Sequence, residues 1–283
     1  MEPLPSIPPD ANKYTRGSLL ILAGSARYPG AAVMAAQAAA RTGAGYVTLA
    51  VPGRVAATCA HAHLLSIPVM EVAESERSSG VFSASAYDDL ASRLSHCDAI
   101  ILGFGITVTP STIALVANVL RDAEVPVVLD ADALNAIAAD DDNHDDENRA
   151  AQALIQSKLS CVLTPHAGEL ARLLRTFSVN DADDLARKTG SVVVAKGPTT
   201  HITDGASSID SSDGTPALAK AGTGDVLAGI IGSLVAQGMS ALAAAKAGVH
   251  IHGVAGRIAA DRLGVRGVMA EDVIEAIPQA MLQ

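Results

Sequence analysis

SLLILAGSARYPGAAVMAAQAAARTG, residues 18–43, places an apolar run, a glycine-containing loop and an alanine-rich stretch in immediate succession. The largely apolar run 18–23 is typical of a strand buried on both faces of a parallel sheet. The stretch 31–42 is rich in alanine, the strongest helix former, and Gly43 stands where helices commonly end. This succession of strand, loop and helix predicts an α/β fold.

The alternation of strand and helix continues along the chain. Apolar runs predict strands at 45–51, 99–102, 125–129, 161–163 and 191–195, and helical periodicity predicts helices at 111–123, 167–175, 181–188, 225–237, 241–263 and 270–282. We therefore expect a three-layer α/β fold, in which helices cover both faces of a mainly parallel sheet. Segment 200–210 differs, because Asp204-Gly205 between two short runs predicts a small antiparallel hairpin at the sheet edge.

The composition excludes some classes of function. The 283 residues carry 20 Lys and Arg against 30 Asp and Glu, a formal charge of −10. Binding to nucleic acid or to an anionic membrane needs a cationic face, so both are disfavoured. Aromatic residues make up only 2%, which argues against a platform that stacks bases. Apolar residues make up 49%, so we expect a single globular domain over residues 1–283.

The sequence also bears on the compartment. Residues 1–17 contain prolines and polar residues instead of the apolar segment of a signal peptide, and no apolar run of about 18 residues follows. Cys59, Cys97 and Cys161 are widely spaced in apolar or helical contexts, so we expect reduced structural thiols. These features predict a cytoplasmic protein.

Two polar features are ambiguous. Residues 140–147 include six acidic side chains, which favours a solvated surface loop and leaves a cation site as the alternative. His250 and His252 stand two residues apart in an expected helix, so they face different sides and are not expected to bind a metal together.

The segment AKAGTGDVLAG, residues 219–229, has the composition of a phosphate-binding turn. Gly222 and Gly224 allow a tight turn that a ligand can approach closely. A helix that begins near Asp225 would point its free N–H groups at this turn, which makes an anion hole. Asp225 itself is either a helix cap or a base that acts on a substrate hydroxyl beside the bound phosphate.

Glycines also follow two other expected strands, at the position where ligands bind in open parallel sheets. Gly24, Gly30 and Ala31 follow the first strand, and Gly105 closes the segment 101–105. Each segment taken singly is also explained as a simple turn between strand and helix. Their occurrence together at strand ends favours a ligand site.

Polar side chains follow two further strands. Asp130 and Asp132 share one side of an extended segment and are candidates to face one pocket, with a helix cap as the alternative for Asp132. His166 is a candidate ligand donor and Glu169 a candidate to hold a cation through water. In the alternative, Thr164 and Glu169 only organise the start of a helix.

The segment AKGPTT, residues 195–200, leaves the 191–195 strand with a cation, a glycine and two hydroxyls. This combination suits the phosphate or ribose of a nucleotide. The alternative is an exposed turn that leads into the hairpin.

These segments together carry a family resemblance. GSARYPGAA, LGFG, VLDADALN, LTPHAGE, AKGPTT and AGTGDVLAG, followed by AAKAGVHIHGVAGRIAA, make the chain similar to the ADP-dependent NAD(P)H-hydrate dehydratase family, a carbohydrate-kinase-related branch of the ribokinase-like superfamily. The similarity implies a ribokinase-like fold and an enzyme with ADP as phosphoryl donor. It implies that the enzyme dehydrates the S epimer of NADH hydrate and NADPH hydrate, and releases AMP and phosphate.

The resemblance also implies roles for matching positions. Asp225 matches the aspartate that contacts the hydrate and is our candidate general base; the hydrate-binding positions are Ala31, Gly105 and His166. The adenine-nucleotide positions are Lys196, Gly197, Pro198, Thr199, Thr200 and Gly224. Backbone amides of Gly222, Thr223 and Gly224 would hold the transferred phosphoryl group. Mg²⁺ is the expected metal, with no ligands assigned.

The chain departs from the family in one loop. Many members carry a stretch similar to Asn-Pro-Gly-Met where residues 214–220 read GTPALAK, so the contacts of this loop, including those of Lys220, are not assigned. Residues 1–17 leave no room for the epimerase domain that some members carry at the N-terminus. We therefore expect a separate NAD(P)H-hydrate epimerase to act with this protein, and the resemblance implies a homotetramer.

Two other functions stay open at this point. One is a ribokinase-like, ATP-dependent kinase of a small vitamin precursor such as hydroxyethylthiazole, although the Asn-x-x-Glu motif of many such kinases does not occur in the chain. The other is a non-catalytic regulator that binds adenylate, against which Asp225 beside the glycine turn argues.

Overall fold

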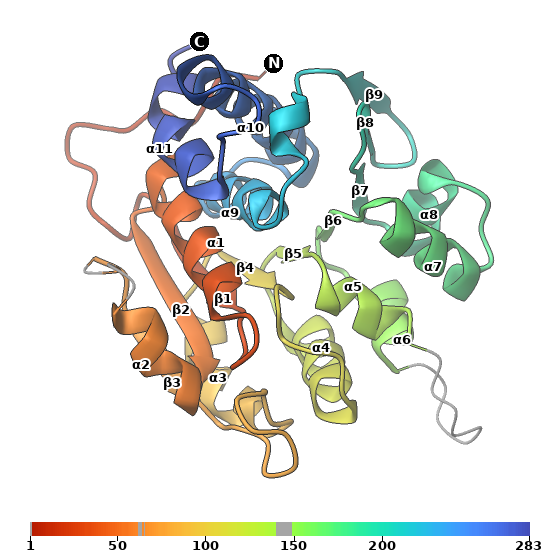
Figure 1. The fold of residues 1–283 in the computed structure, drawn as a ribbon. Coiled ribbons are helices and arrows are strands. Elements are labelled where there is room, and N and C mark those ends of the chain that lie inside the picture. The colour runs from red at the N-terminus through yellow and green to blue at the C-terminus, as the bar shows by residue number, and fades with distance from the viewer. Residues whose placement is uncertain (1, 62–63, 65, 140–148) are drawn as a thin grey trace.

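A single sheet runs through the molecule in the computed structural model, which describes residues 2–61, 64, 66–139 and 149–283 (Figure 1). Within these residues the strand order is β3-β2-β1-β4-β5-β6-β7-β8-β9. The strands are β1 (Ser18–Leu22), β2 (Tyr46–Pro52), β3 (Val69–Val72), β4 (Ala99–Leu102), β5 (Val127–Leu129), β6 (Val162–Leu163), β7 (Val192–Ala195), β8 (Thr200–Thr203) and β9 (Ser208–Ser211).

The sheet is parallel except at one edge. Strands β1 to β7 pair in parallel, whereas β8 runs antiparallel to β7 and β9 antiparallel to β8. The predicted edge hairpin is thus confirmed. Because β1 pairs with both β2 and β4, the order of the strands reverses between β1 and β4. In open α/β sheets, ligands bind at such a switch point, beyond the carboxyl ends of the strands.

Helices cover both faces of the sheet, which confirms the three-layer architecture (Figure 1). One face packs against α1 (Pro29–Thr42), α2 (Gly53–His61), α9 (Thr223–Ala236), α10 (Ala241–Leu263) and α11 (Ala270–Ala280). The other packs against α3 (Ala86–Leu94), α4 (Pro110–Asp122), α5 (Asp132–Ile137), α6 (Arg149–Gln156), α7 (Ala167–Phe177) and α8 (Ala182–Thr189).

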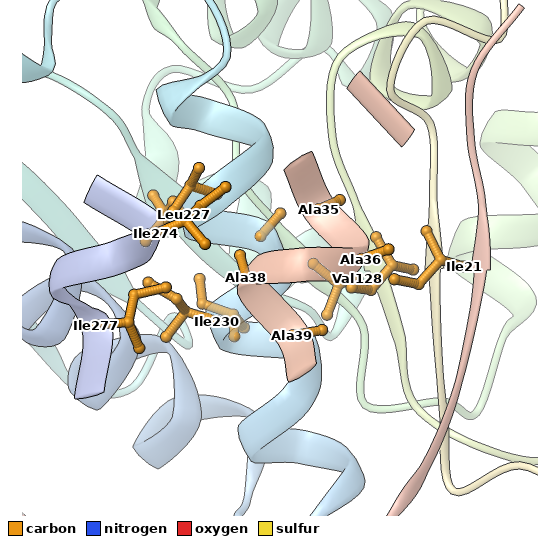
Figure 2. Close-up of a cluster of buried hydrophobic side chains, with 14 of the residues drawn as sticks. Ile21, Ala35, Ala36, Ala38, Ala39, Val128, Leu227, Ile230, Ile274 and Ile277 are labelled. Carbon is orange, nitrogen blue, oxygen red and sulfur yellow. The ribbon is translucent and has the colours of Figure 1, made fainter. Parts of the chain in front are cut away.

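Small residues let α1 and α9 approach each other closely. Figure 2 shows alanines of α1 between the sheet residue Ile21 and the isoleucines of α9 and α11. A Cβ atom at Gly229 of α9 would lie only 2.5 Å from the carbonyl oxygen of Ala35, so a larger residue there would push the helices apart. This contact fixes the middle of α9, the helix that begins at the glycine turn, against the middle of α1.

Several elements differ from the sequence prediction. The edge strand β3 and the helices α2, α3 and α6 were not anticipated, α5 was anticipated only through the alternative of Asp132 as a helix cap, and α9 begins at Thr223, two residues before Asp225. The acidic run 140–147 lies outside the described residues. The three cysteines are free and buried, as expected. In the described part of the chain, no helix is long and apolar enough to cross a membrane.

Candidate active site

The loops that follow the parallel strands are joined by backbone hydrogen bonds at the carboxyl edge of the sheet. The Gly24 amide donates to the Phe104 carbonyl at 2.7 Å, which links the loops after β1 and β4. The Lys196 amide donates to the Pro165 carbonyl at 2.8 Å, which links the loops after β7 and β6. The predicted site segments therefore lie along one edge, although the sequence separates them widely.

The switch point between β1 and β4 holds two of the predicted hydrate-binding residues. Gly105 has φ +62°, and a Cβ there would lie 2.6 Å from the Cβ of Tyr28, so glycine is required. Ala31 is the third residue of α1, directly after the loop that contains Tyr28. Gly105 thus lies against the loop that leads into Ala31, and Tyr28 in this loop is exposed.

An ion pair joins the ends of β5 and β7. The Nζ atom of Lys196 lies 2.8 and 3.1 Å from the two carboxylate oxygens of Asp130. It also lies 3.4 Å from the position that a Cβ on Gly224 would occupy. The predicted nucleotide lysine is therefore already located beside the glycine turn.

The glycine turn itself is closed by Thr223. Gly222 has φ +92° and a Cβ there would lie 2.5 Å from the Met34 sulfur, so only glycine fits. The Thr223 hydroxyl donates to the carbonyls of Leu218 and Lys220 at 2.7 and 2.9 Å. Its amide, expected in the anion hole, faces the Lys220 carbonyl at 3.4 Å. The Gly224 amide and the Asp225 amide, which belong to the first turn of α9, have no partner within the helix.

Asp225 is not the N-cap of α9. The N-cap is Gly222, and Asp225 is the third residue of the helix, partly buried. Burial and, after it, the charge of Asp130 raise the pKa of Asp225 to about 8, although Lys196 opposes this effect. A carboxyl group with such a pKa can take up a proton near neutral pH, as a general base must.

Asp132 also acts on this group. Its charge, like that of Asp130, contributes to the raised pKa of Asp225, and that both carboxylates face one pocket stays a prediction. Asp132 is the first residue of α5 and its Oδ2 accepts a hydrogen bond from the Thr107 amide at 2.9 Å. The alternative of a helix cap is therefore wrong for Asp132, whose carboxylate instead fastens the loop after β4.

His166 and Glu169 form a capping box at the start of α7. The Nδ1 atom of His166 accepts from the Gly168 amide at 3.0 Å, and Glu169 Oε2 accepts from the His166 amide at 2.9 Å. Thr164 takes no part, because its hydroxyl faces the Leu129 carbonyl at 3.3 Å. Burial and the nearby Asp130 raise the pKa of Glu169. Glu169 thus acts as a capping residue, while the His166 ring remains 57% exposed beside β7.

A cleft of about 580 Å³ opens between the loop after β7, the hairpin β8–β9, the start of α9 and the middle of α10. Four of the predicted nucleotide residues, Lys196, Gly197, Pro198 and Thr200, line it together with Gly224. Thr199 is exposed outside this lining. The apolar part of the wall comes from Pro216, Leu218, Leu227 and Val249. A polar end with a lysine and an apolar wall together suit a nucleotide.

The divergent loop 214–220 forms one side of this cleft. Gly214, Thr215, Pro216, Leu218 and Ala219 belong to the lining. The ammonium group of Lys220 donates to the Arg266 carbonyl at 2.8 Å. Lys220 therefore fastens this loop to the segment before α11.

From the sequence, we expected only that His250 and His252 do not bind a metal together, and we assigned them no role. Their spacing does place them on different sides. His250 Nδ1 lies 2.9 Å from Asp213 Oδ2, which ties the loop after β9 to α10. His252 lines the cleft, its Nε2 is buried with no hydrogen-bond partner among the residues that the structure describes, and burial lowers the pKa of the ring to about 4. A neutral imidazole thus lies under the glycine turn.

We compared the chain with known protein families and with characterised relatives. The family model for NAD(P)H-hydrate dehydratase matches residues 19–279. The bifunctional NAD(P)H-hydrate repair enzyme of Salinibacter ruber is 40% identical over 68% of this chain and 34% of its own length, so the chain spans about a third of such relatives. The ADP-dependent (S)-NAD(P)H-hydrate dehydratase of Xanthomonas campestris is 36% identical, over 72% of this chain and 67% of its own.

A solved structure agrees with these relatives. The ADP/ATP-dependent NAD(P)H-hydrate dehydratase of Bacillus subtilis, crystallised with ATP and Mg²⁺, superposes with a TM-score of 0.77 at 25% identity. The alignment covers 98% of this chain and 93% of that one. The fold and the glycine turn thus define a ribokinase-like α/β protein. Within that class, the chain belongs to the NAD(P)H-hydrate dehydratase family.

Proposed function

We propose that this protein is an ADP-dependent dehydratase for the S epimer of NADH hydrate and NADPH hydrate, which regenerates NADH or NADPH and releases AMP and phosphate. The observation that carries this proposal is the position of Asp225. It directly follows Gly224, which lines the nucleotide cleft with Lys196, and it lies near Asp130 and Asp132, whose charges raise its pKa. A base at that position can serve a hydroxyl of one ligand and a phosphate of the other.

The reaction follows from this geometry in two steps. ADP binds in the cleft, with its β-phosphate against the first-turn amides of α9 and the Lys196 ammonium. Asp225 accepts the proton of the hydrate hydroxyl as its oxygen attacks the β-phosphorus, the bond to the bridging oxygen breaks, and AMP leaves. The ring nitrogen lone pair then expels phosphate, and loss of a proton from the neighbouring carbon restores the double bond.

Phosphorylation has a clear chemical purpose in this sequence. Hydroxide is a poor leaving group and phosphate a good one, so the transferred group makes the elimination possible. The loops that hold Ala31 and Gly105 lie at the same carboxyl edge of the sheet, and His166 follows β6 at that edge with its ring exposed, although its Nε2 already contacts the capping carboxylate at 3.2 Å. These residues and Asp225 are our assignments for hydrate binding.

Mg²⁺ accompanies ATP in the Bacillus subtilis structure, and we include it as the companion of the nucleotide. The donor groups here do not form a cage for it: within the described residues no three His, Cys, Asp or Glu converge. Asp130 also gives both its oxygens to Lys196. Because Mg²⁺ keeps several waters and binds phosphate oxygens readily, the ion would arrive on the nucleotide.

We further propose that the enzyme is a cytoplasmic homotetramer that acts together with an NAD(P)H-hydrate epimerase activity. The relatives named as bifunctional repair enzymes support an association of the two activities. Light scattering on the purified protein should give four times the 28.7 kDa chain mass. A monomer or dimer at micromolar concentration would contradict the assembly.

The activity is tested by incubating the pure protein with NADH hydrate and ADP. We expect recovery of the absorbance of reduced nicotinamide together with one AMP per NADH. The kinase alternative is tested in parallel with hydroxyethylthiazole and ATP. A phosphorylated thiazole with no recovered NADH would overturn the proposal, and binding of ADP without either reaction would favour a regulator.

A further inference from the structure

Asp130 places a negative charge in the protein interior at the end of β5. Its side chain is only 2% exposed, and that of its partner Lys196 is 20% exposed. Moving two charges out of water is costly, and apolar residues often stabilise a protein equally well at such positions. Stability alone is therefore a weak explanation for this ion pair.

The direction of the Asp130 side chain is fixed by several independent contacts. Its amide donates to the Leu102 carbonyl at 3.2 Å, and its Oδ1 accepts from the Ala131 amide at 2.8 Å. Ala131 has φ +51°, a strained conformation for a residue with a Cβ. A Cβ on Gly103 would lie 2.0 Å from the Asp130 carbonyl oxygen, so the neighbouring loop packs directly on this backbone.

The fixed Asp130 carboxylate restricts the side chain of Lys196. A lysine ammonium on a free four-carbon chain loses considerable rotamer entropy when it is held in one place. Here the bidentate contact with Asp130 holds Nζ within 3.4 Å of the Cβ position of Gly224, at the start of α9. The entropy is thus lost during folding and does not have to be lost again when a ligand binds.

We propose that Asp130 is a positioning residue that presets the Lys196 ammonium beside Gly224 for the incoming nucleotide phosphate. The inference rests on the proposed function in one respect, namely that the ligand at the glycine turn is a nucleotide. Asp130 itself does not contact the reacting atoms.

The charges around the pair determine what else removal of Asp130 would change. Asp225 of α9 faces Asp130, Asp132 and Lys196. Glu169 of α7 faces Asp130, Lys196 and His166. Removing the charge of Asp130 therefore lowers the pKa of Asp225 towards the ordinary range of a carboxyl group. A residue with a merely structural role would not shift the titration of Asp225 in this way.

A double-mutant cycle on ADP binding tests the positioning role without any turnover. Calorimetry compares the wild type, Asp130→Asn, Lys196→Gln and the double variant. We expect Lys196→Gln to weaken ADP binding about tenfold or more in the wild type, as for loss of a charge-assisted hydrogen bond. In the Asp130→Asn background it should weaken binding about threefold or less, because the ammonium is no longer preset.

Asp98→Asn is the matched control. Asp98 Oδ2 accepts from the Ser18 amide at 2.8 Å at the opposite edge of the sheet, so it removes one charge far from the cleft. ADP binding to this variant should equal that of the wild type. An equal or larger effect of Lys196→Gln in the Asp130→Asn background would overturn the proposal. So would a wild type that does not bind ADP.

Turnover supplies a second readout. Asp130→Asn should lower the value of kcat on the plateau above the acid limb about tenfold while the KM for ADP changes less than about threefold, and the acid limb of kcat/KM should move to lower pH. An unmoved acid limb would overturn the proposal. If Asp130→Asn does not fold, Asp130→Glu replaces it in the cycle. If Lys196→Gln then weakens ADP binding as much in the Asp130→Glu background as in the wild type, the positioning role is contradicted. If Asp130 and Lys196 are coupled in ADP binding but the enzyme does not dehydrate NADH hydrate, the proposed function is refuted and the positioning role stands.

Discussion

Asp225 lies among two carboxylates and one ammonium, which gives it an unusual affinity for protons. Its pKa is raised to about 8, chiefly by burial and then by Asp130. At pH 7 only about a tenth of the molecules therefore carry the carboxylate in the free enzyme. The same burial that makes the group costly to ionise makes it a strong base at the moment of transfer.

This position predicts a pH profile. The value of kcat/KM should rise with pH along an acid limb centred near pH 8, because only the ionised Asp225 accepts the hydroxyl proton. Asp225→Asn should lower kcat by about a hundredfold or more and leave ADP binding within about threefold. Stopped-flow recovery of NADH absorbance and calorimetry with ADP measure the two effects. Unchanged turnover would remove Asp225 from the mechanism.

Asp225→Asn, which should lose turnover, should gain conformational stability at alkaline pH. The folded-state pKa is raised above its unfolded value, so the contribution of Asp225 to stability is present below about pH 4 and is lost as pH rises through about 8. Asn carries no such titration. Thermal unfolding at pH 8 should therefore show Asp225→Asn to be more stable than the wild type, whereas at pH 4 the two should agree.

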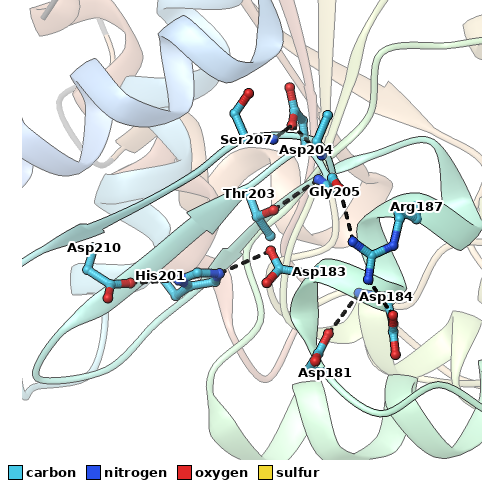
Figure 3. Close-up of polar contacts among 11 residues, drawn as sticks. Asp181, Asp183, Asp184, Arg187, His201, Thr203, Asp204, Gly205, Ser207 and Asp210 are labelled. Carbon is cyan, nitrogen blue, oxygen red and sulfur yellow. Dashed lines mark hydrogen bonds and ion pairs between the residues drawn. The ribbon is translucent and has the colours of Figure 1, made fainter.

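At the scale of elements, the hairpin β8–β9 is fastened to α8 by one histidine (Figure 3). His201 Nδ1 lies 2.6 Å from Asp210 Oδ1 within the hairpin, and its Nε2 lies 3.3 Å from Asp183 Oδ1 of α8. Both carboxylates raise the pKa of His201, with Asp210 the larger cause. The neighbouring hairpin residues Thr200 and Ser211 line the nucleotide cleft, so this attachment supports the cleft wall.

The hairpin attachment should depend on pH with a defined sign. The pKa of His201 is raised, so its stabilisation is complete below about pH 6.5 and is lost as pH rises through the folded-state value. The pKa of Asp183 is lowered, so its contribution is lost as pH falls through the acid range. Hydrogen exchange of β8 and β9 should therefore be slowest near pH 5 to 6, after correction for intrinsic rates.

His201→Gln is the comparison for this prediction. It keeps a polar side chain but cannot titrate, so protection of the hairpin amides should no longer fall between pH 6 and 8. Asp204→Asn, which changes only the turn between the two strands, should retain the wild-type profile. Identical pH profiles for the wild type and His201→Gln would show that the histidine does not control this edge.

Which elements could be predicted follows from their burial. The central strands are continuous apolar runs because both faces are covered, so they stand out in sequence. Edge strand β3 contains the exposed Glu71 and has only four residues, which leaves no such signal. The sequence left a capping arrangement at α7 open as an alternative, but the side chain that accepts from the first helix amides is that of His166 and not of Thr164. Ring nitrogens as N-caps are rare, so composition gave no hint of it.

At the scale of the whole molecule, the site depends on strand order, which no local pattern contains. Asp130 and Lys196 stand 66 residues apart and meet across the end of β6. The sequence identified both as residues at strand ends but not as partners. It likewise identified the glycine turn, whereas the environment of Asp225 and the buried His252 follow only from the packing of α9 and α10 on the sheet.

The cleft gathers residues from β7, the loop 214–220, α9 and α10, so ADP should stabilise the whole fold. At about 100 times its Kd, a ligand of the native state adds about 2.7 kcal/mol to the free energy of unfolding. For a chain of this size this corresponds to a rise in Tm of about 5 °C. Adenosine lacks the phosphates that the glycine turn and Lys196 would bind, and should raise Tm less.

Substitutions at the two glycines of the turn should have different effects, one on ligand binding and the other on folding stability. Gly224 has helical geometry, and the nearest atom to an added Cβ is Lys196 Nζ at 3.4 Å. Gly224→Ala should therefore fold with at least wild-type Tm, because alanine favours the helix, while its methyl group occupies the phosphate position and removes the rise with ADP. Gly222→Ala meets the Met34 sulfur at 2.5 Å with φ +92° and should lower Tm without any ligand. A full ADP shift in Gly224→Ala, measured by scanning calorimetry, would place the phosphate elsewhere.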